Sequence, residues 1–228
     1  MDPTLTPRPR PVRAAADPHD VIDPAILYFG TPVALLSTVD ADGRANLAPM
    51  SSVFWLGSTA LLGLGARSQT ALNIAATGEV VINLPSSSQV DAVDRLALTT
   101  GRDPVPPRKH AVGYRHVADK FARAHLTPLP SDRVVPARAA ECPVQMEARL
   151  TSTHPLERDD AHEAGTIVAF EVAVVRTHVH RAIRAPGTSH RVDPARWRPL
   201  IMSFQRFYGL GGELRPSRLA GIDEEWYR

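Results

Sequence analysis

The sequence predicts a mainly β protein, a closed antiparallel barrel with a few inserted α-helices. Three observations support this prediction: several apolar or alternating segments have strand length, short turn-forming links join most of them, and helical patterns are few. A doubly wound parallel sheet is disfavoured, because no GxGxxG motif follows a predicted strand. No internal repeat divides the chain, and a length of 228 residues is consistent with one barrel domain.

The first three predicted strands form a meander. Residues 31–39, TPVALLSTV, make a continuous apolar run, which is typical of a strand buried on both faces. The sequence DADG (40–43) then predicts a hairpin turn, in which Gly43 can take a positive φ. The chain returns over residues 44–55 and runs out again as TALLGLG (59–65), so short links join three antiparallel strands.

Three helices interrupt the strands. Ser68 is a good N-cap for a helix that Gly78 ends, and EVVINL (79–84) follows as a fourth strand. Residues 87–100 predict a second helix, and residues 118–125 predict a short third one. The apolar faces expected for the first two helices consist of Leu72, Ala75 and Ala76, and of Val90, Val93, Ala97 and Leu98.

The later strands show a period of two. Residues 144–150 and 166–175 each place apolar side chains at every second position, as a strand with one core-facing side requires. The core-facing positions are Val144, Met146, Ala148, Leu150, Val168, Phe170, Val172 and Val174. The positions facing the other way in the first of these strands are Gln145, Glu147 and Arg149.

The chain divides into an arm and a single domain. Residues 1–20 are rich in Pro and Arg and are predicted to be a mobile N-terminal arm. Residues 21–228 are predicted to form the barrel domain, with an aromatic-containing C-terminal extension.

Composition and charge disfavour several classes of function. The formal net charge is +2 and the arginines are scattered, so nucleic-acid binding has little support. Cys142 is the only cysteine, which excludes an intramolecular disulfide and a CxxC-type metal site, and predicts a structural thiol in a reducing cytoplasm. No apolar run approaches the roughly 20 residues of a membrane span. The first 20 residues also lack the apolar region of a secretory signal.

One polar segment interrupts the predicted meander. The sequence NLAPMSSVFW (46–55) places Asn46, Pro49, Ser51 and Ser52 between two apolar strands. Because proline cannot donate to a ladder, we expect pairing to break locally at Pro49 and to free nearby backbone groups. Such groups suit a planar heteroaromatic ring, and small hydroxyls suit a polyol. The alternative is a β-bulge with exposed serines.

A second polar segment opens the first predicted helix. The sequence GARSQTALN puts Arg67 and Ser68 at the helix start, with Gln69 and Thr70 in its first turn. Unpaired N–H groups and the helix dipole favour an anion there, and Arg67 adds a bidentate donor. The alternative is an ordinary capped surface helix. One segment thus suits a ring and a polyol, and the other, one strand away, suits a phosphate. Ring, polyol and phosphate are the three parts of FMN.

These segments resemble the flavin reductase-like family of FMN-binding split barrels. The resemblance covers residues 28–175 and rests on TPVALLSTVDADGRANLAPMSSVF, LLGLGARSQTALNI, GEVVINLP and the later DKFARAHLTPLPSDRVVPARAAECPVQMEARL. It implies an antiparallel split β-barrel and a homodimer with flavin at or near the subunit interface. The positions implied to line the isoalloxazine and ribityl are Asn46, Leu47, Ala48, Pro49, Met50, Ser51 and Ser52.

The same resemblance assigns the phosphate. It implies that Arg67, Ser68, Gln69 and Thr70 hold this group. It puts Asn73, which is also a cofactor-binding candidate, and Asn83 at near-site or structural positions.

The chain departs from the family on a late strand. Many members that reduce free flavin carry a Gly-Asp-His step, whereas this chain has no such triplet and reads RTHVHRAIR late in the barrel. His178 or His180 could substitute, as weak catalytic candidates, or both could simply face solvent. An H-x-H metal site is less favoured because no third ligand is evident, so no metal is predicted. Tyr208 could close over a flavin or a partner subunit, or lie in the core.

The expected function is that of a flavin reductase. The protein would bind FMN non-covalently, with FAD as an alternative, and take a hydride from NADH or NADPH. Reducing equivalents would then pass to a free flavin, a partner oxygenase or another acceptor. One alternative is a non-enzymatic FMN-binding electron-transfer protein, and another is a flavin-free split barrel that serves as a binding module. Neither a nucleic-acid nor a membrane partner is expected.

Overall fold

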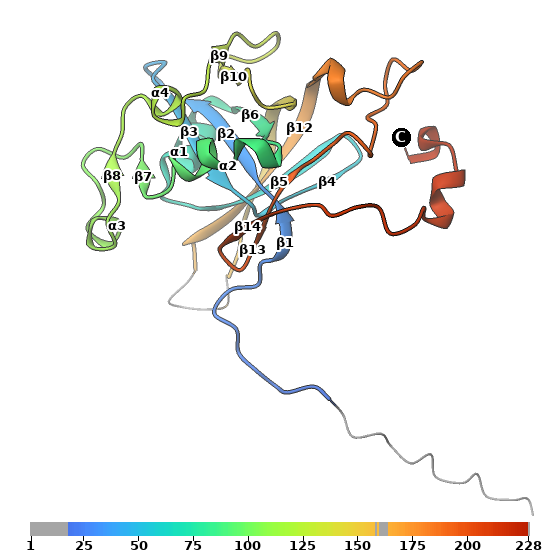
Figure 1. Ribbon diagram of the computed structural model, residues 1–228. Helices are drawn as coiled ribbons and strands as arrows, with labels where there is room; N and C mark the ends of the chain where they lie inside the picture. The colour runs from blue at the N-terminus through green and yellow to red at the C-terminus, as the bar shows by residue number, and fades with distance from the viewer. Residues whose placement is uncertain (1–17, 158, 160–163, 228) are drawn as a thin grey trace, which may run out of the picture.

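The fold is a split β-barrel with short helices on its outside (Figure 1). The computed structural model describes residues 18–157, 159 and 164–227. Most of the predicted N-terminal arm, residues 1–17, therefore lies outside the described residues. Residues 18–27 run away from the barrel at its lower end in Figure 1, and the C-terminal segment lies to the right of the barrel.

Strands dominate the element list. In chain order they are β1 (Phe29–Pro32), β2 (Ala34–Val39), β3 (Ala45–Met50), β4 (Val53–Leu56), β5 (Thr59–Gly65), β6 (Glu79–Leu84), β7 (Thr99–Thr100), β8 (Arg115–His116), β9 (Pro128–Leu129), β10 (Arg138–Ala139), β11 (Val144–Pro155), β12 (Ile167–Val179), β13 (Leu200–Ser203) and β14 (Arg206–Gly209). The α-helices are α1 (Gln69–Thr77), α2 (Val90–Asp94), α3 (Pro107–Ala111) and α4 (Lys120–Ala124). The 3-10 helices are η1 (Ser87–Gln89), η2 (Arg181–Ile183), η3 (Arg218–Gly221) and η4 (Glu224–Tyr227). None of the described helices is long and apolar enough to cross a bilayer.

Strand order shows why the main sheet closes on itself. The 7-stranded antiparallel sheet has the order β3-β2-β6-β11-β12-β5-β4. Its two edge strands, β3 and β4, are joined by only Ser51 and Ser52. The sheet must therefore curl until its edges meet, and the Gly63 N–H donates to the Ser52 carbonyl at 2.8 Å at that point. The predicted antiparallel split barrel is confirmed.

Two apolar clusters hold the barrel and its outer layer together. Leu36 of β2 joins β11 and β12 residues such as Met146 and Val172 inside the barrel. Leu35 points the other way, into a cluster that includes Val93 and Phe121 of the outer helices. Both faces of β2 are therefore buried, as its continuous apolar sequence predicts.

The first hairpin forms as predicted. The Asp40 carboxylate accepts hydrogen bonds from the backbone N–H groups of Asp42 and Arg44 at 3.0 and 2.9 Å. Gly43 takes a φ of 81°, which glycine adopts without steric cost. The predicted first strand differs at its start, because residues 29–32 leave the main sheet and pair with β13 in a separate 3-stranded sheet, β1-β13-β14.

Helix α1 has the predicted ends but not the predicted buried face. The Ser68 side chain caps its start, and Gly78 ends it with a φ of 70°. The expected apolar face is wrong, since Leu72, Ala75 and Ala76 are exposed. The helix instead turns its polar Thr70 and Asn73 inward, beside Ala71 and Ile74, because these polar groups find partners on the sheet.

The second predicted helix is much shorter than expected. Only η1 and α2 form within residues 87–100, and Thr99 already belongs to β7. Val93 is buried as predicted, but Ala97 and Leu98 are exposed. Leu98 takes a φ of 53°, so the helical path ends there and the chain turns into β7.

Candidate functional site

The rim of the barrel, defined here as residues 46–52, lies at the open edge of the main sheet. β3 is an edge strand, and Pro49 stays paired in register with Leu35. The predicted break at Pro49 is therefore wrong: the ladder runs on to Met50 and stops at Ser51. An edge strand tolerates proline because the missing donor can face away from the neighbouring strand.

The two rim serines sit where the barrel closes. Ser51 is buried, and Ser52 is half-buried with its hydroxyl 3.2 Å from the Tyr28 hydroxyl. A side chain at Gly63 would meet Ser52 Cβ at 3.0 Å, so the edges meet tightly. The alternative of a bulge with freely exposed serines is not what the structure shows.

The predicted site residues on β3 and α1 meet in two hydrogen-bonded groups, one around Asn46 and one around Asn73. Asn46 Nδ2 donates to Thr70 Oγ1 at 3.1 Å, which joins the rim to the first turn of α1. Gln69 Nε2 donates to Asn73 Oδ1 at 2.7 Å, and Asn73 Nδ2 donates to Thr38 Oγ1 at 3.0 Å. The structure thus brings four predicted residues together, but each already has a partner within the protein.

Lys120 joins the group around Asn46 and was not among the predicted site residues. Its side chain is 4% exposed, and Nζ donates to Asn46 Oδ1 at 3.0 Å. Burial, together with the charge of Lys109, lowers the pKa of Lys120 to about 8. The sequence carries only a weak signal for this role: Lys120 falls in the predicted short helix, directly before the apolar Phe121.

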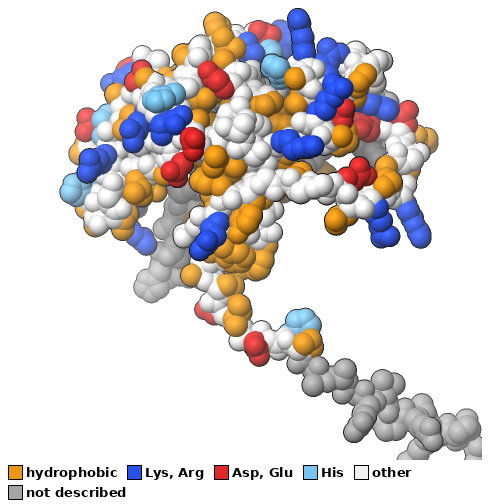
Figure 2. All heavy atoms as spheres, in the orientation of Figure 1, with side chains coloured by type: hydrophobic (Ala, Val, Ile, Leu, Met, Phe, Trp, Pro, Cys, Tyr) orange, Lys and Arg blue, Asp and Glu red, His pale blue; other side chains and the backbone are white. Residues whose placement is uncertain are grey.

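Two further cations lie in the same region: Lys109, whose charge acts on Lys120, and Arg102, whose charge acts on Lys109. Burial lowers the pKa of Lys109, and the neighbouring charge of Arg102 lowers it further. We refer to Arg102, Lys109 and Lys120 as the basic cluster. In Figure 2, Lys, Arg and His side chains gather, with a few acidic ones, over the part of the surface where Figure 1 places α3, β7 and β8.

Gly101 brings the basic cluster against the rim. A Cβ built there would lie 2.5 Å from Asn46 Oδ1 and 3.0 Å from Gln69 Cγ. Only glycine therefore allows this close approach. The site that the structure assembles consists of the rim, the start of α1 and the basic cluster, and we call it the candidate site.

The other residues that were predicted to hold the phosphate, Arg67 and Ser68, lie at the start of α1. Ser68 Oγ accepts from the Ala71 N–H at 3.1 Å, so the hydroxyl oxygen serves as a helix cap. Arg67 is exposed, and no hydrogen bond or ion pair joins its side chain to the described part of the chain. Its guanidinium is therefore available to a ligand.

Asn83 lies inside the protein and bonds to neither of these groups. Its side-chain amide donates to the Leu35 carbonyl and the Ser37 hydroxyl, at 3.0 and 2.9 Å, and accepts from the Ala139 N–H at 2.8 Å. All of these partners are protein groups, so Asn83 joins β6 to β2 and β10.

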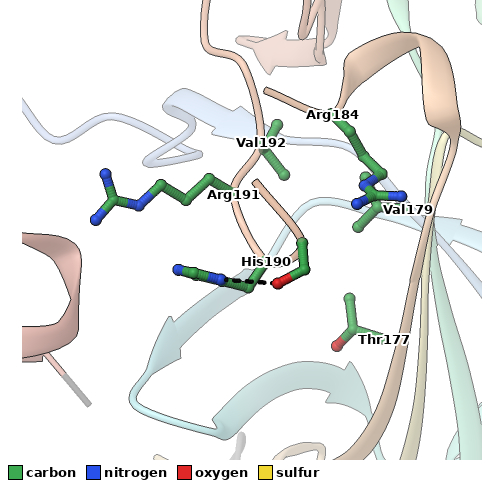
Figure 3. Close-up of a pocket in the computed structure, with 7 residues that line it drawn as sticks. Thr177, Val179, Arg184, His190, Arg191 and Val192 are labelled. Carbon is green, nitrogen blue, oxygen red and sulfur yellow. Dashed lines mark hydrogen bonds between the residues drawn. The ribbon is translucent and has the colours of Figure 1, made fainter. Parts of the chain in front are cut away.

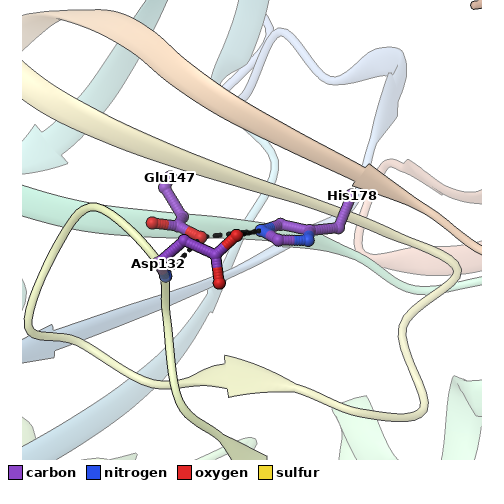
Figure 4. Close-up of side chains that lie close together, drawn as sticks. All are labelled: Asp132, Glu147 and His178. Carbon is purple, nitrogen blue, oxygen red and sulfur yellow. Dashed lines mark hydrogen bonds and ion pairs between the residues drawn. The ribbon is translucent and has the colours of Figure 1, made fainter.

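The two late histidines occupy different settings. His178 Nε2 lies 2.7 Å from Glu147 Oε1 (Figure 4). His180 follows the end of β12 and accepts from the Ala182 N–H at 3.2 Å, so it caps η2. The two histidines therefore do not share a strand face, as their H-x-H spacing on one strand would predict, because β12 stops at Val179.

Glu147, the partner of His178, is fully buried. Its carboxylate also accepts from the backbone N–H groups of Asp132 and Arg133, at 3.0 and 2.6 Å. Burial by itself would raise the pKa of Glu147, but these hydrogen bonds and the one from His178 hold the pKa below its ordinary value. Sequence alternation placed Glu147 outside the apolar core, yet it is 0% exposed.

Asp132, Glu147 and His178 each offer one metal-ligating atom, and these atoms lie within 4.8 Å of one another. The Glu147 carboxylate already accepts from two backbone N–H groups, and the guanidinium Nε of Arg176 lies 3.7 Å from Asp132. A nearby fixed cation opposes a bound metal ion. The arrangement is an internal ion-pair network that fastens the loop at residue 132 to β11 and β12.

A cavity of about 380 Å³ lies beside the end of β12 (Figure 3). No predicted site residue lines it. Its walls are Thr177, Val179, Arg184, Ser189, His190, Arg191 and Val192. The Arg191 side chain points towards the C-terminal segment in Figure 3 and forms ion pairs with Asp223 and Glu224, which offset its charge.

Tyr208 and Cys142 complete the predicted residues. Tyr208 lies on β14 and is half exposed, so it is a surface residue rather than a core one. Burial, with the charge of Glu141, raises the pKa of the Cys142 thiol to about 12. A thiol held in its protonated form is unreactive, as expected for a structural cysteine.

Comparison with known proteins places this geometry in a family. The model of the "Flavin reductase like domain" matches residues 26–211. A Bacillus subtilis (strain 168) relative, the uncharacterized protein YdfE, is 34% identical over 193 residues, which is 85% of this chain and 90% of that protein.

Solved structures share the fold. The flavoredoxin of Desulfovibrio vulgaris (Miyazaki F) superposes with a TM-score of 0.70 at 22% identity, covering 89% of this chain and 99% of that one. The nitrilotriacetate monooxygenase component B of Bacillus cereus gives a TM-score of 0.67 at 21% identity, covering 82% and 88%. The chain is a member of the flavin reductase-like domain family.

Proposed function

We propose that the protein is a flavin-dependent oxidoreductase that binds FMN non-covalently at the candidate site and uses NADH or NADPH as hydride donor. The observation that carries this proposal is Lys120, a buried cation next to Asn46 and the start of α1, in a chain of the flavin reductase-like family. FAD is the alternative flavin.

The residues of the candidate site fit a phosphorylated flavin. The start of α1, with the unengaged guanidinium of Arg67, suits the phosphate. The rim, with Pro49 on an edge strand and the two serines at the closure, offers a rigid ledge with polar groups for the ring and polyol. A nonpolar ligand would leave Lys120 without an anion.

The chain itself needs no acid or base for this reaction. When bound, the flavin supplies the hydride-accepting chemistry, and the protein supplies binding, orientation and electrostatics. Hydrogen bonds fix the wall of the site, because Asn46 is held by Thr70 and Asn73 is held by Thr38. His178 is engaged by Glu147 and is not required for hydride transfer.

An oxygenase is one acceptor that would use the reduced flavin. The support is similarity in fold to a protein named as component B of a monooxygenase. A homodimer is also part of the proposal, because apolar side chains are exposed on the β1-β13-β14 sheet. The single buried thiol is consistent with the reducing cytoplasm expected from the sequence.

Anaerobic titration tests the proposed activity. The full chain, purified and mixed with FMN, should shift the visible flavin spectrum, and NADH or NADPH should then remove the flavin absorbance faster than it does with free FMN. Absence of any spectral shift with FMN and with FAD would reject the proposal.

A non-enzymatic electron-transfer protein is the second candidate. The specific observation in its favour is that both late histidines are engaged within the protein, so neither is poised beside a donor. Stopped-flow mixing separates the two functions. Rapid bleaching of bound flavin by a nicotinamide supports the reductase, whereas a bound flavin that is inert to both nicotinamides supports the electron carrier.

A further inference from the structure

The cavity at the end of β12 shares no lining residue with the candidate site. Its volume of about 380 Å³ lies in the range of small-molecule pockets. Its walls are the last residues of β12, the residue that follows η2, and residues 189–192 (Figure 3). A β-bridge joins Arg184 to Val192, and the Ala185 N–H donates to the Arg191 carbonyl at 2.9 Å. Backbone pairing therefore holds the cavity open as a formed part of the fold.

One wall of the cavity is apolar. Thr177 and Val179 are two residues apart on β12 and therefore share a face, opposite to the face that carries His178 and its partner Glu147. Val179, and Val192 from the facing loop, are partly buried and pack against the barrel core. Their remaining exposed surface lines the cavity, and such a surface favours the hydrocarbon part of a ligand over water.

Arg184 brings a positive charge to this apolar wall. Its side chain is partly buried, extends towards Val179 in Figure 3, and donates from Nη2 to the Thr188 carbonyl at 2.8 Å. That bond uses one of the five N–H groups of a guanidinium. Among residues 18–157, 159 and 164–227, no ion pair includes Arg184. The guanidinium therefore has donors and a charge to offer to a ligand.

Arg191, the other arginine of the lining, has a different role. Its ion pairs with Asp223 and Glu224 join it to the C-terminal segment and offset its charge. These pairs fix the outer side of the cavity, because they tie residues 189–192 to a second part of the chain. Arg184 is therefore the arginine of the lining that is available to an anion.

We propose that this cavity is a second ligand site, which binds a small organic acid with one carboxylate and an apolar body. The carboxylate pairs with Arg184, because a guanidinium matches a carboxylate in a two-pronged geometry. The apolar body lies on Val179 and Val192, and the hydroxyls of Thr177 and Ser189 offer further hydrogen bonds to a carboxylate oxygen. Inorganic phosphate would pair with Arg184 but leave the two valines in water, so an organic acid fits better.

Benzoate is the probe for this site. Benzyl alcohol is its neutral counterpart, and inorganic phosphate is an anion without an apolar body. In a ¹H–¹⁵N NMR titration of the full chain at pH 7, benzoate should cause saturable shifts in the backbone signals of residues 177–192. Both comparison compounds should bind at least about tenfold more weakly, because each lacks one of the two interactions.

The decisive variant is Arg184→Met, which removes the charge and keeps a long side chain. It should weaken benzoate by about tenfold or more, and Arg184→Lys should restore part of the affinity. Arg181→Met is the control, because it removes an exposed arginine of η2 that does not line the cavity, and it should leave the affinity unchanged. Melting curves confirm that each variant is folded.

A second variant keeps the proposal testable if Arg184→Met does not fold. Ser189→Phe places a bulky side chain at an exposed position of the lining and leaves Arg184 intact. It should exclude benzoate, while the affinity for FMN stays that of the wild type. Benzoate binding that is unchanged in Ser189→Phe would contradict the site.

The outcomes separate this site from the proposed function. Saturating FMN should leave the affinity for benzoate unchanged, because the two sites share no residue. If the chain binds no flavin, yet benzoate shifts residues 177–192 and these shifts are lost in Arg184→Met, the proposed function fails and the second site stands. Absence of shifts, equal binding of benzyl alcohol or phosphate, or competition between benzoate and FMN would overturn the second site.

Discussion

At the scale of single residues, polar side chains are easier to predict than their partners. Asn46, Gln69, Thr70 and Asn73 stand out in the sequence as hydrogen-bonding groups among apolar neighbours. In the structure they pair with one another, Asn46 with Thr70 and Gln69 with Asn73. Local spacing cannot show this, because residue 46 meets residue 70 only after the sheet has folded.

Lys120 is a second residue whose place in the structure the sequence does not predict. In the sequence it is one of two lysines, on a short predicted helix, and nothing local distinguishes it from a surface residue. Its burial depends on where α4 packs against the rim. Because this burial arises from long-range packing, the sequence does not predict that Lys120 belongs to the candidate site.

The exposed guanidinium at the start of α1 leads to the first prediction. Arg67→Ala should weaken the binding of FMN by about 1.5–3 kcal/mol and the binding of riboflavin very little. The reason is that only FMN carries the anion that Arg67 would pair with. Flavin fluorescence quenching measures both affinities. Equal loss for the two ligands would place the phosphate elsewhere.

The buried carboxylate gives a second prediction, on stability. Glu147→Gln should lower the free energy of unfolding by about 1–3 kcal/mol at pH 7, because one amide hydrogen would face a backbone N–H donor. The pKa of Glu147 is lower in the folded protein than its ordinary value of 4.5, so its contribution is complete above that value and lost as the pH falls through the folded value. The wild type should therefore lose more stability than Glu147→Gln between pH 7 and pH 4.

Urea unfolding at the two pH values measures this difference. The control is Glu171→Gln, which alters an exposed pair in which His154 Nε2 lies 3.1 Å from the Glu171 carboxylate. Exposed pairs contribute little to stability, so this control should change the unfolding free energy by less than about 1 kcal/mol. An identical pH dependence in wild type and Glu147→Gln would contradict the role given to Glu147.

At the scale of elements, ends were more predictable than faces. Ser68 and Gly78 determine the ends of α1 through local backbone chemistry, so the sequence predicts them directly. The buried face of α1 depends on tertiary partners, which is why Leu72 faces solvent and Asn73 faces inward. Likewise, the strand pairing of β3 ends at Met50, just before the barrel closes. This end depends on the whole sheet rather than on Pro49.

The contact between Gly101 and the rim gives a third prediction. Gly101→Ala should lower the free energy of unfolding by about 1–3 kcal/mol and weaken the binding of FMN. The reason is that the new methyl group would displace Asn46 and, with it, Lys120. Gly211→Ala is the matched control, since a Cβ there meets nothing within 4 Å. Urea unfolding and flavin titration report the two effects, and unchanged FMN affinity in Gly101→Ala would contradict the link.

At the scale of the whole molecule, the fold class was predictable and the strand order was not. Alternation and turn signals indicate antiparallel strands, and the resemblance to a family supplies the split barrel. The pairing of β2 with β6, and of β12 with β5, brings distant segments together and has no local signature. The 3-stranded sheet of β1, β13 and β14 went unpredicted for the same reason.

This small sheet carries the prediction of a dimer. Phe29 and Phe204 form an exposed edge-to-face pair with ring centroids 4.8 Å apart, and Tyr208 lies on the same sheet. Figure 2 shows hydrophobic side chains gathered over the region where Figure 1 places β1, β13 and β14. A patch of this kind is typical of an interface.

Light scattering should give the mass of a dimer for the wild type and a smaller mass for the double variant Phe29→Ser with Phe204→Ser. Leu98→Ser, at a similarly exposed apolar residue outside this sheet, is the control and should remain dimeric. A wild-type mass equal to that of one 24.8 kDa chain would contradict the dimer.

The central claim is that the rim, the start of α1 and the basic cluster together bind a phosphorylated flavin. The most direct measurement is a fluorescence titration of FMN and of riboflavin with the purified full chain at pH 7. The account predicts that both flavins are quenched and that FMN binds about tenfold tighter or more, since only its phosphate meets the cations. Absence of quenching with FMN, or equal affinity for the two flavins, would contradict it.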